Sequence, residues 1–110
     1  MKQTQLIKGT LEGCVLGIIS QKEVYGYELM QALKENGFES IVGGTLYPLL
    51  AKLEKNGDLV STIRASDNGP DRKYYSLTTQ GQQTLSVFEK EWNRLNGNVN
   101  QILRQAKNHE

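Results

Sequence analysis

The chain has 110 residues, of which 37% are hydrophobic and 23% charged, and its formal net charge is only +1. This length allows one domain with one modest core, and no apolar run approaches the length of about 18 residues that a membrane span needs. The near-neutral charge excludes a uniformly basic surface, so any attraction to nucleic acid has to come from local clusters of charge.

The N-terminal part predicts a helix over residues 4–20 that is apolar on more than one side. Such a helix has to be covered on more than one side, which indicates a partner chain, and we assign Leu11 and Val15 to that dimer interface. Cys14 is the single cysteine, so a disulfide within the chain is excluded and a reducing cytoplasm is favoured. We expect Cys14 to be a small buried hydrophobic residue, and the segment lacks the features of a signal peptide.

Residues 25–37 predict a second helix that ends at Gly37. Gly26 is unfavourable in a first helical turn, so we expect it to allow the close approach of another backbone.

A third helix is predicted between Gly43 and Gly57. Pro48 has no amide hydrogen, which places it in the first turn and starts the helix near Gly44 or Thr45. The face opposite its apolar stripe is small, neutral to basic and free of acids, as an element that enters a phosphate-lined groove requires. Two short helices joined by a compact turn predict a helix-turn-helix. The stripe recurs with the period of a helix, at Leu46, Leu49, Leu50 and Leu53.

The period changes to two after Gly57, which predicts a strand over residues 59–64. Residues 66–70 are a dense turn signal, and residues 72–77 predict the returning strand. A hairpin that follows a helix-turn-helix is the wing of a winged-helix domain. The alternative is a hairpin with ordinary solvated charges.

The last predicted helix is capped by Thr78 or Thr79 and carries apolar residues at alternating spacings of three and four. This is the a/d seam of a coiled coil, about 33 Å long. A small domain offers too little surface to cover such a helix, so we expect it to pair with a second chain; folding back onto its own core is the alternative. Gly97 weakens or kinks the helix. The seam contains Leu85, Phe88, Trp92, Leu95, Val99, Ile102 and Ala106.

The elements together predict a mainly α fold with a small β-hairpin. Residues 1–78 form a winged helix-turn-helix domain, whose first helix, residues 4–20, is shared with the dimer interface, and residues 79–110 form a dimerisation helix. The only histidine, His109, lies in the terminal tail, and there is no phosphate-binding glycine loop or cluster of metal ligands. We therefore expect no enzyme, no catalytic residue, no metal and no cofactor.

Several motifs resemble those of the PadR family of transcriptional regulators, over nearly the full chain. The length is similar to that of the smaller subfamily, in which a single C-terminal helix replaces a longer helical domain. The resemblance implies a dimeric repressor of cytoplasmic DNA sites. The motifs are Tyr25-Gly26-Tyr27-Glu28-Leu29, then Gly44-Thr45-Leu46-Tyr47-Pro48-Leu49-Leu50 with Leu53-Glu54-Lys55, and then Arg72-Lys73-Tyr74-Tyr75 with Leu77-Thr78.

The predicted function is that of a homodimeric repressor on a pseudo-palindromic site in double-stranded DNA. Thr45, Tyr47 and Lys52 are expected to face the groove. Tyr25 either donates its hydroxyl to a phosphate or acts as a buried hinge. The alternative function is a winged-helix module that binds another protein. Phosphate contacts are assigned to Lys55, Arg64, Arg72 and Lys73.

The resemblance also concerns a ligand site. In multidrug-sensing members of the family, an aromatic residue of the last helix lines a pore between the protomers, and Trp92 occupies that place. Trp92 then either stacks on a small aromatic effector, whose polar edge Asn96 orients, or fills the dimer core.

Overall fold

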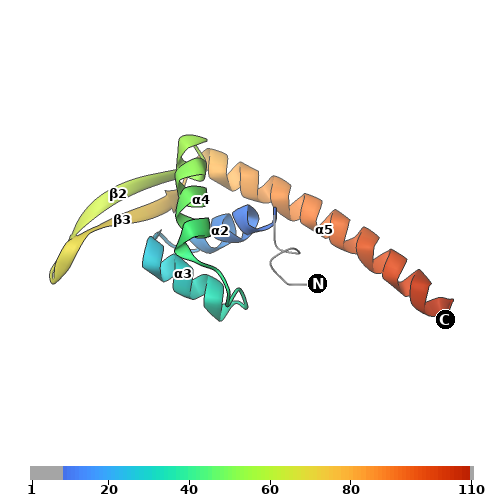
Figure 1. The fold of residues 1–110 in the computed structure, drawn as a ribbon. Helices are drawn as coiled ribbons and strands as arrows, with labels where there is room; N and C mark the ends of the chain where they lie inside the picture. Colours follow the sequence, from blue (N-terminus) through green and yellow to red (C-terminus); the bar gives the residue numbers. More distant parts are fainter. Residues whose placement is uncertain (1–8, 110) are drawn as a thin grey trace.

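The structure is a computed structural model that describes residues 9–109. The described elements are α2 (Leu11–Ile19), β1 (Val24–Tyr25), α3 (Gly26–Glu35), α4 (Gly43–Lys55), β2 (Leu59–Ser66), β3 (Gly69–Leu77) and α5 (Thr79–Asn108). Three short helices form a body from which the β2–β3 hairpin extends on one side and α5 on the other (Figure 1). The predicted fold, a winged helix-turn-helix with a long C-terminal helix, is confirmed. The first helix was expected over residues 4–20, of which residues 4–8 lie outside the described part. Residues 9 and 10 form a turn, so the described helix begins later than expected, at Leu11.

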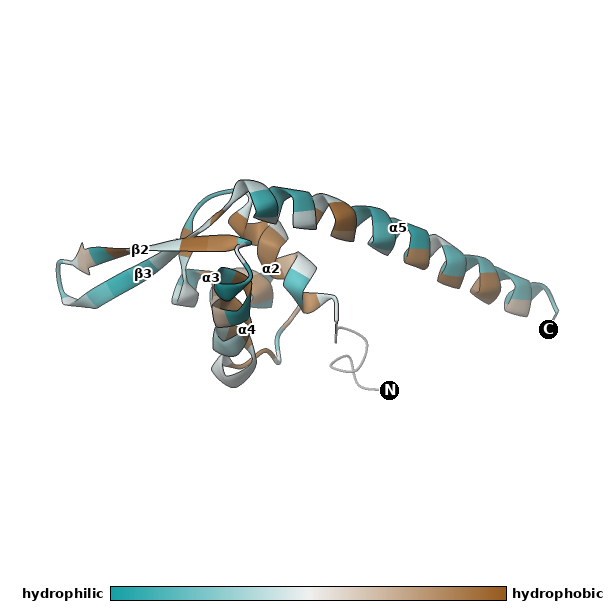
Figure 2. Cartoon of the chain, turned by 90° about the horizontal axis from the view of Figure 1, so that it is seen from above, coloured by the Kyte–Doolittle hydropathy of each residue, from teal (hydrophilic) through white to brown (hydrophobic). Residues whose placement is uncertain are grey.

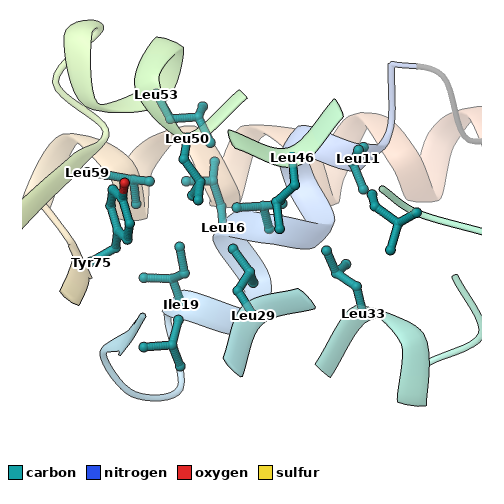
Figure 3. Close-up of a cluster of buried hydrophobic side chains, with 13 residues drawn as sticks. Leu11, Leu16, Ile19, Leu29, Leu33, Leu46, Leu50, Leu53, Leu59 and Tyr75 are labelled. Atoms are coloured by element: carbon teal, nitrogen blue, oxygen red, sulfur yellow. The ribbon is translucent and has the colours of Figure 1, made fainter. Parts of the chain in front are cut away.

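The core lies between α2, α3, α4 and the base of the sheet. Leucines of the three helices meet there (Figure 3), and Leu16, Leu29 and Leu50 are at most 1% exposed. Each such side chain contributes about 1.5–3 kcal/mol through removal from water. Two residues that we assigned to a dimer interface belong to this core, because Leu11 is 8% and Val15 0% exposed within the single chain. Their side chains are already covered, and this part of the prediction is corrected.

The wing belongs to a three-stranded antiparallel sheet of order β1-β3-β2. Strand β1 pairs Val24 with Tyr75 and Tyr25 with Tyr74, although Tyr25 was expected to open the second helix. Two residues are too short to produce a periodic signal, so β1 was missed. In β2 and β3 the register runs from Leu59 opposite Leu77 outwards, with a bulge after Arg64.

Helix α4 begins at Gly43, so Pro48 is its sixth residue rather than a member of its first turn. The expected start near Gly44 or Thr45 was therefore late. Pro48 leaves the Gly44 carbonyl without its helical donor, and both residues are exposed. The carbonyl remains open to water, which is why the helix tolerates the proline there.

Helix α5 is continuous over 30 residues, and the amide of Gly81 donates to the Thr78 hydroxyl (2.9 Å), which identifies Thr78 as its cap. Gly97 does not interrupt it. Every residue from 89 to 109 is exposed, so the helix does not fold back on its own core.

Candidate nucleic-acid interface

The exposed face of α4 is formed by small residues and one lysine. Their spacing of four, three and four residues places them on one stripe, opposite the buried leucines. A face without bulky or acidic side chains lets the helix backbone approach a partner closely. The four exposed residues of this face are Gly44, Pro48, Ala51 and Lys55.

The residues predicted to face the groove lie on the two flanks of this stripe. At about 100° per residue, Tyr47 and Lys52 are separated by about 140° around α4. The Lys52 ammonium contacts Glu12 of α2 at 2.6 Å, whereas the Tyr47 ring lies against Gly26, where an added Cβ would stand 2.6 Å from it. Gly26 thus accommodates an aromatic side chain, not another backbone as expected. Thr45 is exposed on the flank of Lys52.

One carboxylate connects α4 to both strands of the wing. Glu54 accepts a hydrogen bond from the Ser61 hydroxyl of β2 and pairs with the Lys73 ammonium of β3, at 2.9 Å. The Ser61 hydrogen bond, followed by Lys73, lowers the pKa of Glu54, and Glu54 raises the pKa of Lys73. The wing is therefore held against the flank of α4.

The two wing arginines lie on the opposite face of the hairpin from Lys73. Arg64 and Arg72 face each other across the strands, one residue out of phase with Lys73. The Arg64 guanidinium lies 4.5 Å above the Tyr74 ring and pairs with Glu23, and that of Arg72 lies 4.6 Å above Tyr25. The predicted phosphate contacts of the wing are thus divided between two surfaces.

Tyr25 supports this outer surface from the start of α3. Its backbone amide donates to the Glu28 carboxylate at 3.2 Å, which caps the N-terminus of α3. Its ring is 6.4 Å from that of Tyr27 and 5.4 Å from that of Tyr74, and the residue is half-buried. Tyr25 therefore packs as a platform for Arg72.

Three of the five predicted basic contacts have an acidic neighbour in the same chain. Lys52, Arg64 and Lys73 pair with Glu12, Glu23 and Glu54 respectively. Within residues 9–109, no ion pair involves Lys55 or Arg72. Sequence reasoning missed these acids because the first two are 40 and 41 residues from their partners. Exposed pairs of this kind contribute about 0–1 kcal/mol, so a phosphate can replace the carboxylate at little cost.

A second surface is the apolar stripe of α5, whose hydrophobic segments recur along the helix (Figure 2). Its exposed residues at the predicted a/d positions are 42–64% accessible: Trp92, Leu95, Val99 and Ile102. Leu103 and Val87, which the spacing did not include, are also exposed, at 54% and 61%. A continuous exposed stripe of this kind marks an interaction surface.

The start of the predicted seam also packs against its own chain. Leu85 and Phe88 are half-buried, and the Phe88 ring covers Gly13 of α2, where an added Cβ would lie 2.2 Å from it. These two residues therefore anchor α5 to the body. Asn96, one turn beyond Trp92, accepts a hydrogen bond from the Asn100 amide at 3.3 Å.

Residues 9–109 contain no helix long and apolar enough to cross a membrane, and no group of three or more side chains that could hold a metal ion. Burial raises the pKa of the Cys14 thiol, which disfavours the reactive thiolate.

The comparisons with known proteins agree with one another. The family described as the transcriptional regulator PadR-like family matches residues 15–87. The solved structure of a Streptococcus transcriptional regulator is 56% identical, covers 89% of this chain and 96% of that one, and superposes with a TM-score of 0.80. A PadR-like transcriptional regulator from Bacillus cereus is 45% identical, with coverages of 90% and 96% and a TM-score of 0.82. A transcriptional regulator of Mycobacterium tuberculosis is 39% identical over 72 residues, which are 66% of this chain and 65% of that protein.

Proposed function

The chain belongs to the PadR-like family of transcriptional regulators, and we propose on this basis that it binds double-stranded DNA as a two-fold homodimer and acts as a repressor. Proteins of this family regulate transcription and are not enzymes. The observation that carries the proposal is the exposed face of α4, which is small, without acids, and ends in Lys55. We infer from the proposed DNA binding that the protein acts in the cytoplasm.

Helix α4 is the recognition helix of this proposal. Gly44 and Ala51 let its backbone approach base edges in the major groove. Its N-terminus has no side-chain cap, and Thr45 and Leu46 both donate to the Val42 carbonyl. The amides of the two glycines before them are left at the helix end, where a phosphate is a favourable acceptor.

The wing supplies further contacts from Lys73, on the side of α4, and from Arg64 and Arg72, on its outer face. Lys73 and Arg64 pair with carboxylates, and Arg72 lies over the Tyr25 ring. DNA therefore competes with these neighbours for the same cations. Phosphates offer bidentate acceptors that fit a guanidinium well.

Helix α5 is the dimerisation element, from residue 79 onwards. A second copy fits its stripe because the stripe repeats at a/d spacing and the chain itself leaves it exposed. The interface consists of Trp92, Leu95, Val99, Ile102 and Leu103, with Leu85 and Phe88 at its inner end. Leu11 and Val15 are buried in the core of the single chain and are not part of this interface.

Trp92 is the proposed effector site. Two indoles that face each other across the two-fold axis offer flat apolar walls for a planar aromatic compound, and Asn96 orients its polar edge. The effector releases DNA only if it favours one separation of the two recognition helices over another. The alternative is that the two indoles fill the dimer core.

The proposal is tested by selecting bound duplexes from random DNA and measuring affinity as a function of salt. We expect a palindrome with half-sites about one helical turn apart, and an affinity that falls steeply with salt because phosphate contacts release counterions. Lys55→Ala should reduce the salt slope by about one, while Lys107→Ala, at the far end of α5, should leave it unchanged. Binding that is absent or independent of salt would instead support a protein-binding module.

A further inference from the structure

Asp58 is the buried charged residue of the described chain, at 6% exposure, and no proposed DNA contact uses it. It follows α4 by three residues. Its carboxylate accepts hydrogen bonds from the Thr84 hydroxyl (2.7 Å) and from the Gln80 side-chain amide (3.1 Å). An ionised carboxylate is buried only when such partners compensate its lost hydration, and both partners come from α5.

The backbone around Asp58 is bonded to the same helix start. The Thr78 amide donates to the Asp58 carbonyl at 3.1 Å, and the Thr78 hydroxyl donates to the Gly57 carbonyl at 2.6 Å. Gln80 also donates to the Asn56 carbonyl at 2.6 Å. The three residues that follow α4 are thereby hydrogen-bonded to the first two turns of α5 and its cap.

Close contact prevents sliding at this joint. A Cβ on Gly81 would stand 2.1 Å from the Asp58 carbonyl oxygen and 2.9 Å from Leu77. The first turn of α5 thus touches the chain that leaves α4. The negative charge of Asp58 also lies at the N-terminus of α5, where the helix dipole favours it.

We propose that this joint, centred on Asp58, fixes the angle between the recognition helix and the dimerisation helix, and so determines which half-site spacing the dimer accepts. Helix α5 has 30 residues and is about 45 Å long, so a tilt of about 10° at its base moves its far end by roughly 8 Å. In a dimer paired through α5, the same tilt changes the separation of the two α4 helices. Asp58, Gln80 and Thr84 are then positioning residues for operator spacing. This inference rests on the proposed dimeric DNA binding.

The test uses the full chain and palindromes whose half-site spacing varies in steps of one base pair. The wild type should prefer one spacing sharply. Thr84→Val removes one hydrogen bond to Asp58 and should reduce that preference at least about fivefold, and Gly81→Ala should shift the optimum. Thr79→Val is the matched control, because Thr79 is exposed on the same turns of α5, and it should retain the wild-type profile.

A second measurement does not need DNA. Spin labels attached at position 55 in both protomers, on a Cys14→Ser background, should give a narrow distance distribution in the wild type and in Thr79→Val and a broad one in Thr84→Val. Equal affinity losses of Thr84→Val at every spacing, with an unchanged distance distribution, would show that the joint only stabilises the fold and would overturn the inference. A wild type that binds no duplex overturns the proposed function itself.

Discussion

The ring of Tyr47 lies against the Cα of Gly26, where a Cβ would stand 2.6 Å from the ring and 3.2 Å from its hydroxyl. The contact joins one flank of the recognition helix α4 to the start of α3, so the orientation of Tyr47 depends on the absence of a side chain at position 26.

Gly26→Ala should therefore destabilise the protein although alanine is the better helix former. Alanine gains up to about 1 kcal/mol in helix propensity, but displacing a packed ring costs about 1–3 kcal/mol. In a Tyr47→Ala background the clash is gone, and the same substitution should stabilise. Urea unfolding of the wild type, the two single variants and the double variant, all at the same protein concentration, measures this change of sign. If Gly26→Ala changes the free energy of unfolding in the same direction in both backgrounds, the contact is contradicted.

Glu12→Gln should strengthen DNA binding if Lys52 contacts a phosphate. The substitution releases Lys52 from its 2.6 Å ion pair and should make the salt dependence steeper by about one released counterion. Glu89→Gln, which removes the same charge from an exposed position on α5, is the matched control. If both variants bind as the wild type does, Lys52 is not a DNA contact.

Glu54→Gln should change the acid stability of the protein. The pKa of Glu54 is lower in the folded chain because of Ser61 and Lys73, so its stabilising contribution is present above the unfolded-state pKa and is lost as the pH falls through the folded one. The variant should be less stable at pH 7 by up to about 1 kcal/mol and should lose less stability between pH 5 and 3. If the urea midpoints of the wild type and the variant change equally with pH over this range, the interaction of Glu54 with Ser61 and Lys73 does not stabilise the fold.

Leu95→Asp should convert the protein to monomers that remain folded. Leu95 is 54% exposed in the single chain, so the charge is tolerated there but not in a paired seam, where burial of an unpaired carboxylate is unfavourable by several kcal/mol. Asn93→Asp places the same charge on the opposite face and should remain dimeric. Sedimentation at micromolar concentration distinguishes them; a monomeric wild type would refute the seam.

Trp92 is the single tryptophan, so its fluorescence reports directly on the proposed effector site. Planar aromatic dyes at micromolar concentration should quench it, and Trp92→Ala should abolish dye binding while the protein remains dimeric. Blue-shifted emission without quenching by any dye would instead place the indoles in a dry dimer core.

The sequence alone determined the elements whose signals are local. The leucines of α4 and the a/d residues of α5 repeat with the period of a helix. The hairpin is indicated by a two-residue period and by the turn residues that follow it. Gly37 and Gly57, predicted to end helices, both have positive φ, +99° and +89°. The two-residue strand β1 is too short for such a signal, and the start of α4 was missed because an exposed carbonyl tolerates Pro48 in the second turn.

Tertiary structure alone decided which side chains meet. The acids that pair with Lys52 and Arg64, the ring that covers Gly26 and the bonds from Asp58 to α5 all join residues that are 21 to 41 positions apart. It also placed Leu11 and Val15 in the core of the single chain. Periodicity determines on which face of its own helix or strand a residue lies. Which element packs against that face depends on the arrangement of all the helices and strands, and that arrangement is set by the burial of the leucine core as a whole.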